Sequence, residues 1–174
     1  FYMRYANQLV LTGALNDTGS PIRQNVDRSY RAGLEWTQEW RPFNGFKWYG
    51  TTTLALNRIE AFDEVLFDYA EGFDPIVSVA HEGTAISLSP GFTASSVASW
   101  EFWNRISSEG LGSTASVEWS FRHVARQFLD NTSSESRSLP AYAVHDARLR
   151  WMKHRSNAGH IGVSLFLRNL LNAQ

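Results

Sequence analysis

Side chains able to hold a metal ion or move a proton are scattered through the sequence. The chain contains five histidines: His81, His123, His145, His154 and His160. None stands in the HExxH spacing that places two imidazoles on one face of a helix. A metal site would therefore require side chains that are far apart in the sequence to lie close together in the fold. His145 and Asp146 are adjacent, and adjacent side chains of a strand point to opposite faces, which argues against joint acid–base catalysis.

Other nucleophilic and cofactor-binding motifs are also missing. The chain has no cysteine, which excludes disulfides, thiolate metal ligands and thiol nucleophiles. It has neither a GxSxG nucleophile elbow nor a glycine-rich phosphate loop. We therefore expect no catalytic residue, no metal site and no cofactor.

The densest group of recognition-type side chains lies between Glu60 and Glu82, which we expect to form a loop. Aromatic and acidic residues are mixed there, and loops on a rigid scaffold commonly carry recognition. The candidates for ligand contact are Phe62, Asp63, Glu64, Phe67, Asp68, Tyr69 and Phe73. The alternative is that the aromatic rings only pack the loop against its neighbours.

Composition favours a protein with one apolar and one wet surface. Of the 174 residues, 43% are hydrophobic and 14% are aromatic, including seven tryptophans. The net charge of −1 and the absence of a lysine or arginine run argue against nucleic-acid binding. No stretch reaches the ~18 apolar residues of a transmembrane helix, so a membrane-spanning form must cross as strands.

Hydrophobicity alternates with a period of two residues, as it does in strands that have one apolar and one polar face. Between Tyr30 and Trp40 the even positions are mostly apolar and the odd positions are mostly charged or polar. The longest alternating run extends from Ile86 to Phe102, with Pro90 as its weakest point because proline cannot donate to a ladder. About seven strands are expected: 1–11, 30–40, 47–57, 86–102, 115–122, 143–151 and 161–167.

The connections alternate in length, which is typical of a transmembrane barrel with short periplasmic turns and long extracellular loops. The short connections are 41–45, 104–110 and 154–158, and the long ones are 13–27, 59–83 and 131–139. The tryptophans that flank the short turns are Trp40, Trp48, Trp100, Trp103 and Trp151. They predict an aromatic girdle at that interface. A soluble β-sandwich or lipocalin-like barrel is the alternative fold.

Charges inside the strands share the polar face, which in a barrel faces the lumen. The expected lumen-facing residues are Arg31, Glu35, Glu118, Arg122, Asp146, Arg148 and Arg150. On the apolar face, charges such as Arg58 and Lys153 occur only at strand ends.

Several strings, in this order, resemble the C-terminal barrel of TonB-dependent receptors of the Bacteroidetes type. They are NQLVLTG (7–13), SYRAGLEW (29–36), WYGTTTLALNRIEAF (48–62), SLSPGFTASS (87–96), QFLDNTSSESRSLPAY (127–142) and LFLRNLLNAQ (165–174). The resemblance implies an all-β, antiparallel transmembrane barrel of about 22 strands in the bacterial outer membrane. Residues 1–174 would be its C-terminal part, without the plug domain and the final strand.

The resemblance also implies the function. Such a receptor imports a scarce nutrient, for example a ferric siderophore, cobalamin or a glycan, and performs no bond chemistry. Its partners would be outer-membrane lipid, its own N-terminal plug domain, the TonB complex, and a small-molecule or oligosaccharide ligand. The alternatives are a passive porin, a barrel-anchored outer-membrane enzyme, or a soluble β-sandwich binding module.

Overall fold

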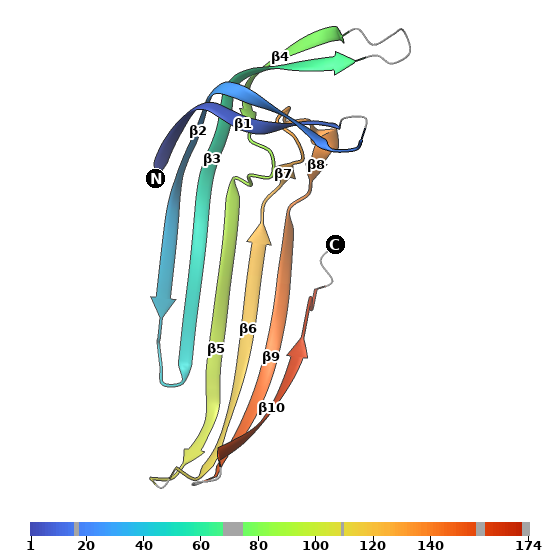
Figure 1. Cartoon of the computed structure of the whole chain (residues 1–174). Coiled ribbons are helices and arrows are strands. Elements are labelled where there is room, and N and C mark those ends of the chain that lie inside the picture. Colours follow the sequence, from blue (N-terminus) through green and yellow to red (C-terminus); the bar gives the residue numbers. More distant parts are fainter. Residues whose placement is uncertain (16–17, 68–74, 109, 156–158, 172–174) are drawn as a thin grey trace. The chain divides into compact units, whose positions relative to one another are not determined.

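The chain forms antiparallel strands joined by hairpins (Figure 1). The computed structural model describes residues 1–15, 18–67, 75–108, 110–155 and 159–171. The strands are β1 (Tyr2–Leu15), β2 (Pro21–Trp40), β3 (Phe46–Phe67), β4 (Pro75–Ala85), β5 (Phe92–Ile106), β6 (Gly112–Val124), β7 (Gln127–Phe128), β8 (Ser138–Leu139), β9 (Tyr142–Arg155) and β10 (Gly159–Leu167). A 3-10 turn, η1 (Glu135–Arg137), lies between β7 and β8. No helix among the described residues has the length and hydropathy needed to span a membrane.

The main sheet is open and has eight strands. Its order is β1-β2-β3-β5-β6-β9-β10, with β4 also paired to β3, while β7 and β8 form a separate two-stranded sheet. The expected all-β antiparallel fold is confirmed, and all seven predicted strands are present. The eighth strand, β4, was not predicted.

Several expected boundaries were wrong. The connection expected at 13–27 is mostly strand, because β1 continues to Leu15 and β2 begins at Pro21. The segment 60–82 is not an irregular loop, because β3 continues to Phe67 and pairs with β4. Conversely, β5 begins only at Phe92, so the predicted strand from Ile86 is too long. Leu88 has a φ of 50°, and Pro90 follows it in the turn, so the chain leaves the extended conformation there.

The chain divides into two compact units. Unit 1 comprises Phe1–Leu34, Thr53–Phe92 and Ala125–Ala141, and unit 2 comprises Glu35–Thr52, Thr93–Val124 and Tyr142–Gln174. The strands β2 and β3 contribute residues to both units.

Unit 1 has a small buried core. All the buried hydrophobic side chains of the described part of the chain belong to it: Val10, Val26, Ile59, Phe62 and Ile86. Four polar residues are also buried there: Ser29, Thr84, Asp130 and Asn131. These side chains therefore exclude water from a small part of the unit.

The connection between β6 and β9 is anchored in unit 1 by polar contacts. The Asn131 Oδ1 atom accepts a hydrogen bond from the Ser87 amide at 2.8 Å, and the Ser133 Oγ atom accepts one from the Ala85 amide at 2.8 Å. The Leu88 amide donates to the Phe128 carbonyl at 2.8 Å. These contacts satisfy backbone groups of the last residue of β4 and of the residues that follow it, where the ladder stops.

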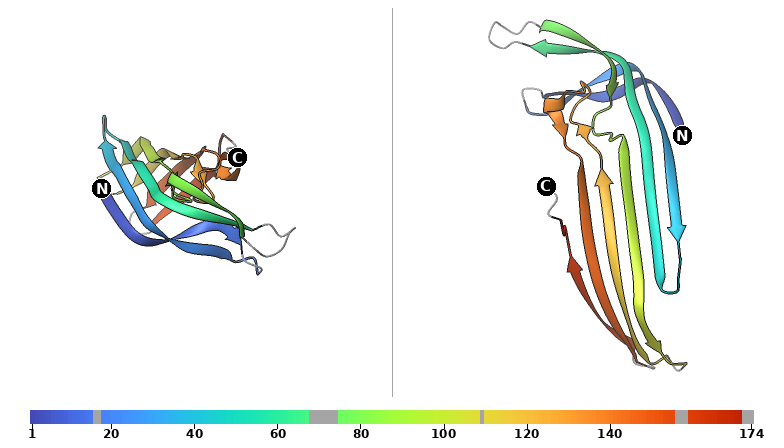
Figure 2. Two further views of the ribbon diagram at one scale, coloured as in Figure 1. Left: turned by 90° about the horizontal axis from the view of Figure 1, so that it is seen from above. Right: turned by 180° about the vertical axis from the view of Figure 1, so that it is seen from behind.

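Unit 2 consists mainly of β5, β6, β9 and β10, which lie side by side in both side-on views (Figures 1 and 2). In the β9–β10 ladder the pair nearest the turn is Arg155 with Gly159. In the β5–β6 ladder it is Ile106 with Gly112. Gly45 lies in the turn between β2 and β3 and has a φ of 83°. Its carbonyl accepts a 2.9 Å hydrogen bond from the Glu101 amide of β5. A side chain at this position would meet the Glu101 carbonyl oxygen at 2.5 Å, so glycine is required.

Candidate functional site

A row of charged and hydroxyl side chains covers one face of unit 2. Directly paired residues of antiparallel strands project from the same face. Glu118 on β6 pairs with Arg148 on β9, and Ser120 pairs with Asp146. The same face therefore carries five of the predicted lumen-facing residues: Glu118, Arg122, Asp146, Arg148 and Arg150.

Arg148 lies at the centre of this polar row and is half-buried. Its Nη2 atom donates to Ser164 Oγ at 3.5 Å, and its guanidinium carbon lies 5.0 Å from the centre of the Phe166 ring. One hollow on this face is lined by Glu118, Asp146 and Arg148. Two carboxylates and a guanidinium group therefore lie close together on a polar surface. The Asp146 Oδ1 atom accepts the Asn169 amide at 2.8 Å, which connects the row to the residues after β10.

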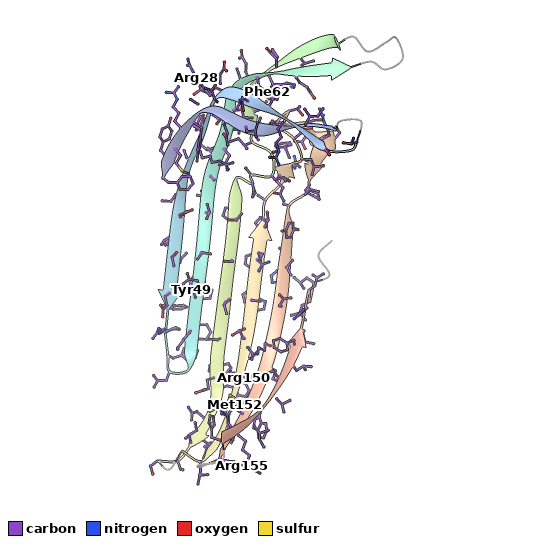
Figure 3. The ribbon with its side chains drawn as sticks, viewed as in Figure 1. Arg28, Tyr49, Phe62, Arg150, Met152 and Arg155 are labelled. Atoms are coloured by element: carbon purple, nitrogen blue, oxygen red, sulfur yellow. The ribbon has the colours of Figure 1, made fainter. Side chains whose placement is uncertain are left out.

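Arg122 and Arg150 are exposed and mark the two ends of the polar row. Arg122 shares a hollow with Asp146 and Ser95, whereas Arg150 lines another hollow with Glu118 and Arg148. Figure 3 shows Arg150 on β9 toward the hairpin end of that strand. These residues could contact polar solutes or a polar protein surface through charge-assisted hydrogen bonds.

The other two predicted lumen-facing residues lie on β2. Glu35 is exposed and belongs to unit 2. Arg31 belongs to unit 1, where its Nη1 atom lies 3.4 Å from Asn57 Oδ1 and 3.3 Å from Ser89 Oγ. The guanidinium of Arg31 is therefore held by two neutral polar partners.

The opposite face of unit 2 is apolar and exposed. Trp119 pairs with Ala147, and Val117 pairs with Leu149, which in turn pairs with Leu165. Exposed large side chains of this face include Trp100 (45%), Trp119 (40%), Leu149 (49%), Trp151 (41%), Ile161 (51%), Val163 (61%) and Leu165 (57%). A contiguous apolar surface of this kind indicates contact with a membrane or another protein.

Aromatic rings gather at both ends of this apolar face. Near the short turns, the Phe43 ring lies 6.4 Å from the Trp100 ring, and Trp100 lies 5.7 Å from Phe102. At the other end, the Phe121 ring lies 5.0 Å from the His145 ring. Two aromatic bands bounding an apolar surface are typical of transmembrane barrels.

The expected tryptophan positions beside the short turns are confirmed. Trp40 ends β2, Trp48 follows the start of β3, and Trp151 lies near the end of β9. Trp103 lies near the end of β5, and its Nε1 atom donates to Ser113 Oγ at 3.1 Å. Rings that carry a satisfied N–H group suit the boundary between lipid and water.

The structure describes only some of the predicted ligand-contact residues. Phe62 is buried at 8% exposure, and its ring stacks on His81 at 4.9 Å, so it is not the exposed aromatic residue that the sequence predicted. Asp63 is exposed. The side chain of Phe67 is not described, and Asp68, Tyr69 and Phe73 lie outside the described residues.

Glu64 belongs to a polar network that sequence patterns did not reveal. Its Oε2 atom lies 2.9 Å from His81 Nε2, and its Oε1 atom lies 3.5 Å from Arg137 Nη1. Arg137 Nη1 also lies 2.9 Å from the buried Asp130 Oδ2. Asp130 Oδ1 accepts the Thr132 amide at 2.9 Å, an Asx-type turn that a D-x-T motif could have indicated.

The network joins the β3–β4 hairpin to the β6–β9 connection and is largely shielded from water. The Glu64 and Asp130 side chains are 11% and 2% exposed. Among the described residues, no group of three or more histidine, aspartate or glutamate side chains is placed to bind a metal.

The antiparallel sheet and the two faces of unit 2 agree with the wall of a transmembrane barrel. A family model described as TonB-dependent receptor-like, β-barrel, matches residues 1–170, and the chain belongs to that family. Its members are transporters of the bacterial outer membrane and not enzymes. Comparisons with curated proteins and with solved structures found no match.

Proposed function

We propose that the chain is the C-terminal barrel portion of a receptor that imports a scarce nutrient, such as a ferric siderophore, cobalamin or a glycan. The observation that supports this most is the family match over residues 1–170. The amphipathic sheet of unit 2 agrees with it, because a barrel wall needs an apolar outer face and a polar inner face. The quoted strings favour the Bacteroidetes-type branch of the family.

In this proposal the polar row of unit 2 lines the lumen. Glu118, Arg122, Asp146, Arg148 and Arg150 would contact an N-terminal plug domain, and they would hydrogen-bond polar groups of the plug while it moves. Energy would reach the plug through the TonB complex.

The β3–β4 hairpin would contribute to ligand selection. Asp63 offers an exposed carboxylate, while Phe62 and Glu64 hold the hairpin in place from its buried side. Phe67, Asp68, Tyr69 and Phe73 remain candidates for direct contact. Replacing 68–74 with a Gly–Ser linker of equal length in the complete receptor should weaken ligand binding without reducing outer-membrane assembly.

A deletion strain tests the proposed function. We expect loss of the gene to abolish high-affinity uptake of one labelled ligand among a ferric siderophore, cobalamin and a glycan. Uptake should return with the wild-type gene and should stay absent in a strain without TonB. Uptake that persists without TonB would identify a passive porin instead.

A further inference from the structure

Two histidines lie side by side near the turn of the β9–β10 hairpin. His154 on β9 is directly paired with His160 on β10, so both side chains leave the same face of the sheet. Their ring centres are 6.3 Å apart, and the ring planes are inclined to each other by 40°. His154 is half-buried and His160 is exposed, so an ion in solution can reach both rings. The hairpin thus brings two imidazoles together without the helical spacing that metal motifs use.

The distance between the rings suits one metal ion shared by both. A bond from a metal to an imidazole nitrogen is about 2.0–2.1 Å long, so two imidazoles on one ion have ring centres about 5–6.5 Å apart, depending on the angle at the metal. The 6.3 Å separation of His154 and His160 lies at the wide end of this range. A wide angle favours an ion with two or three ligands, such as Cu(I), over Zn(II), which takes four ligands in a tetrahedron.

A thioether lies next to the histidine pair. Met152 precedes His154 by two residues on β9, so both side chains leave the same face. Met152 is paired with Gly162, and its Cγ atom lies 3.5 Å from the place that a Cβ atom of residue 162 would take. The glycine therefore leaves this space to the methionine. His160 is the diagonal neighbour of Met152, a distance that a long side chain with three rotatable bonds can bridge. Figure 3 shows Met152 near the turn end of β9.

Neighbouring cationic side chains leave the histidine pair accessible. Lys153 and Arg155 flank His154 in the sequence, so their side chains leave the opposite face of β9. On the other side of His154 the paired residue of β6 is Gly112, which has no side chain. Arg150 shares the face of His154, but its Cα atom is four residues away along the strand, about 13 Å. Salt screens charges at that separation, so an incoming cation meets uncharged nitrogen and sulfur donors.

We propose that His154, His160 and Met152 bind one Cu(I) ion on the polar face of unit 2, and we call these three residues the copper site. The imidazoles supply two nitrogen ligands, and the thioether supplies a soft third ligand that selects copper over zinc. The described part of the chain holds no cluster of three or more histidine, cysteine, aspartate or glutamate residues, and the copper site differs from such a cluster because its third donor is a methionine. The copper site is independent of the nutrient that the receptor imports.

Titration of the purified complete receptor with Cu(I) tests the proposal. The receptor is kept in detergent without oxygen and with ascorbate, and a chromogenic Cu(I) chelator competes for the ion. His154→Gln and His160→Gln should each lower the number of bound copper ions by one per receptor, because the imidazole that remains cannot compete with the chelator. Met152→Leu keeps the size of the side chain but removes the thioether. The sulfur neighbour of the bound copper should therefore be lost from the X-ray absorption spectrum of M152L.

A matched control separates the copper site from histidines in general. His145→Gln removes an imidazole from the opposite face of β9, where the paired residue is Phe121, and should leave the copper count unchanged. Equal losses in H145Q and H160Q would indicate non-specific binding and overturn the proposal. So would an unchanged count in H160Q, displacement of the copper by Zn(II), or an unchanged sulfur signal in M152L. If H154Q does not assemble, H160Q decides alone, since His160 is exposed. Nutrient uptake is not part of this measurement, so the outcome is separate from that of the deletion strain.

Discussion

Units 1 and 2 bury their hydrophobic side chains in different ways. Unit 1 encloses Ile59 and Val26 at 0% and 1% exposure, whereas unit 2 leaves Leu149 and Val163 at 49% and 61%. Both units are built from the same kind of antiparallel strand, so the difference lies in what covers the apolar side. Unit 1 covers part of it with its own chain and leaves Leu34 and Leu56 exposed at 62% and 56%, whereas unit 2 buries no hydrophobic side chain among the described residues and needs lipid to cover its apolar side.

The largest expected effect is the loss of a core side chain from unit 1. Replacing Phe62 with alanine should destabilise the unit by about 3–5 kcal/mol, because it removes a buried ring and leaves a cavity. Hydrogen exchange of unit 1 amides in the complete receptor measures this. Leu9→Ala, at a side chain that is 56% exposed, is the control and should leave exchange nearly unchanged. Equal protection in the two variants would mean that Phe62 is not a core residue.

The next effect should appear only in a bilayer. Leu149→Arg places a charge on the apolar face of unit 2 and should cost about 2–4 kcal/mol in lipid. The matched variant Ser120→Arg lies on the polar face, opposite Asp146, and should cost much less. Denaturant midpoints of the complete receptor in vesicles give both values. A larger loss for S120R would reverse the assigned faces.

A smaller effect compares two arginines near the β6–β9 connection of unit 1. Arg137→Ala leaves Asp130 and Glu64 with fewer partners and should cost about 1.5–3 kcal/mol. Arg126 pairs with Glu135 at the surface, where both side chains are more than half exposed, so Arg126→Ala should cost at most about 1 kcal/mol. Limited proteolysis at 125–141 should be faster in R137A than in R126A. Similar cleavage rates would show that the buried network does not anchor this segment.

The sequence predicts the two faces of unit 2 because alternation is local. Trp119 and Leu149 stand at apolar positions and Glu118 and Arg148 at polar ones, and a strand has no other way to place them. The core of unit 1 was not predictable in this way. Phe62 stands among acidic residues, and it is buried with Val10 and Val26 from other strands and stacks on His81 of β4. Asp130 and Asn131 look like solvated loop residues, yet both are buried: Asp130 pairs with the nearby Arg137, and Asn131 binds the amide of Ser87, which is distant in sequence.

We expect the apolar face of unit 2 to contact lipid and the polar face to contact water. Because the chain has no cysteine, single-cysteine variants can report on each face separately. A fluorophore at Leu149→Cys or Val163→Cys in the complete receptor, reconstituted in vesicles, should be quenched by lipids with nitroxide-labelled acyl chains. The same fluorophore at Ser120→Cys or Ser116→Cys should respond instead to a water-soluble quencher. Equal quenching by the nitroxide lipids at all four positions, or stronger quenching at Ser120 and Ser116, would contradict the account.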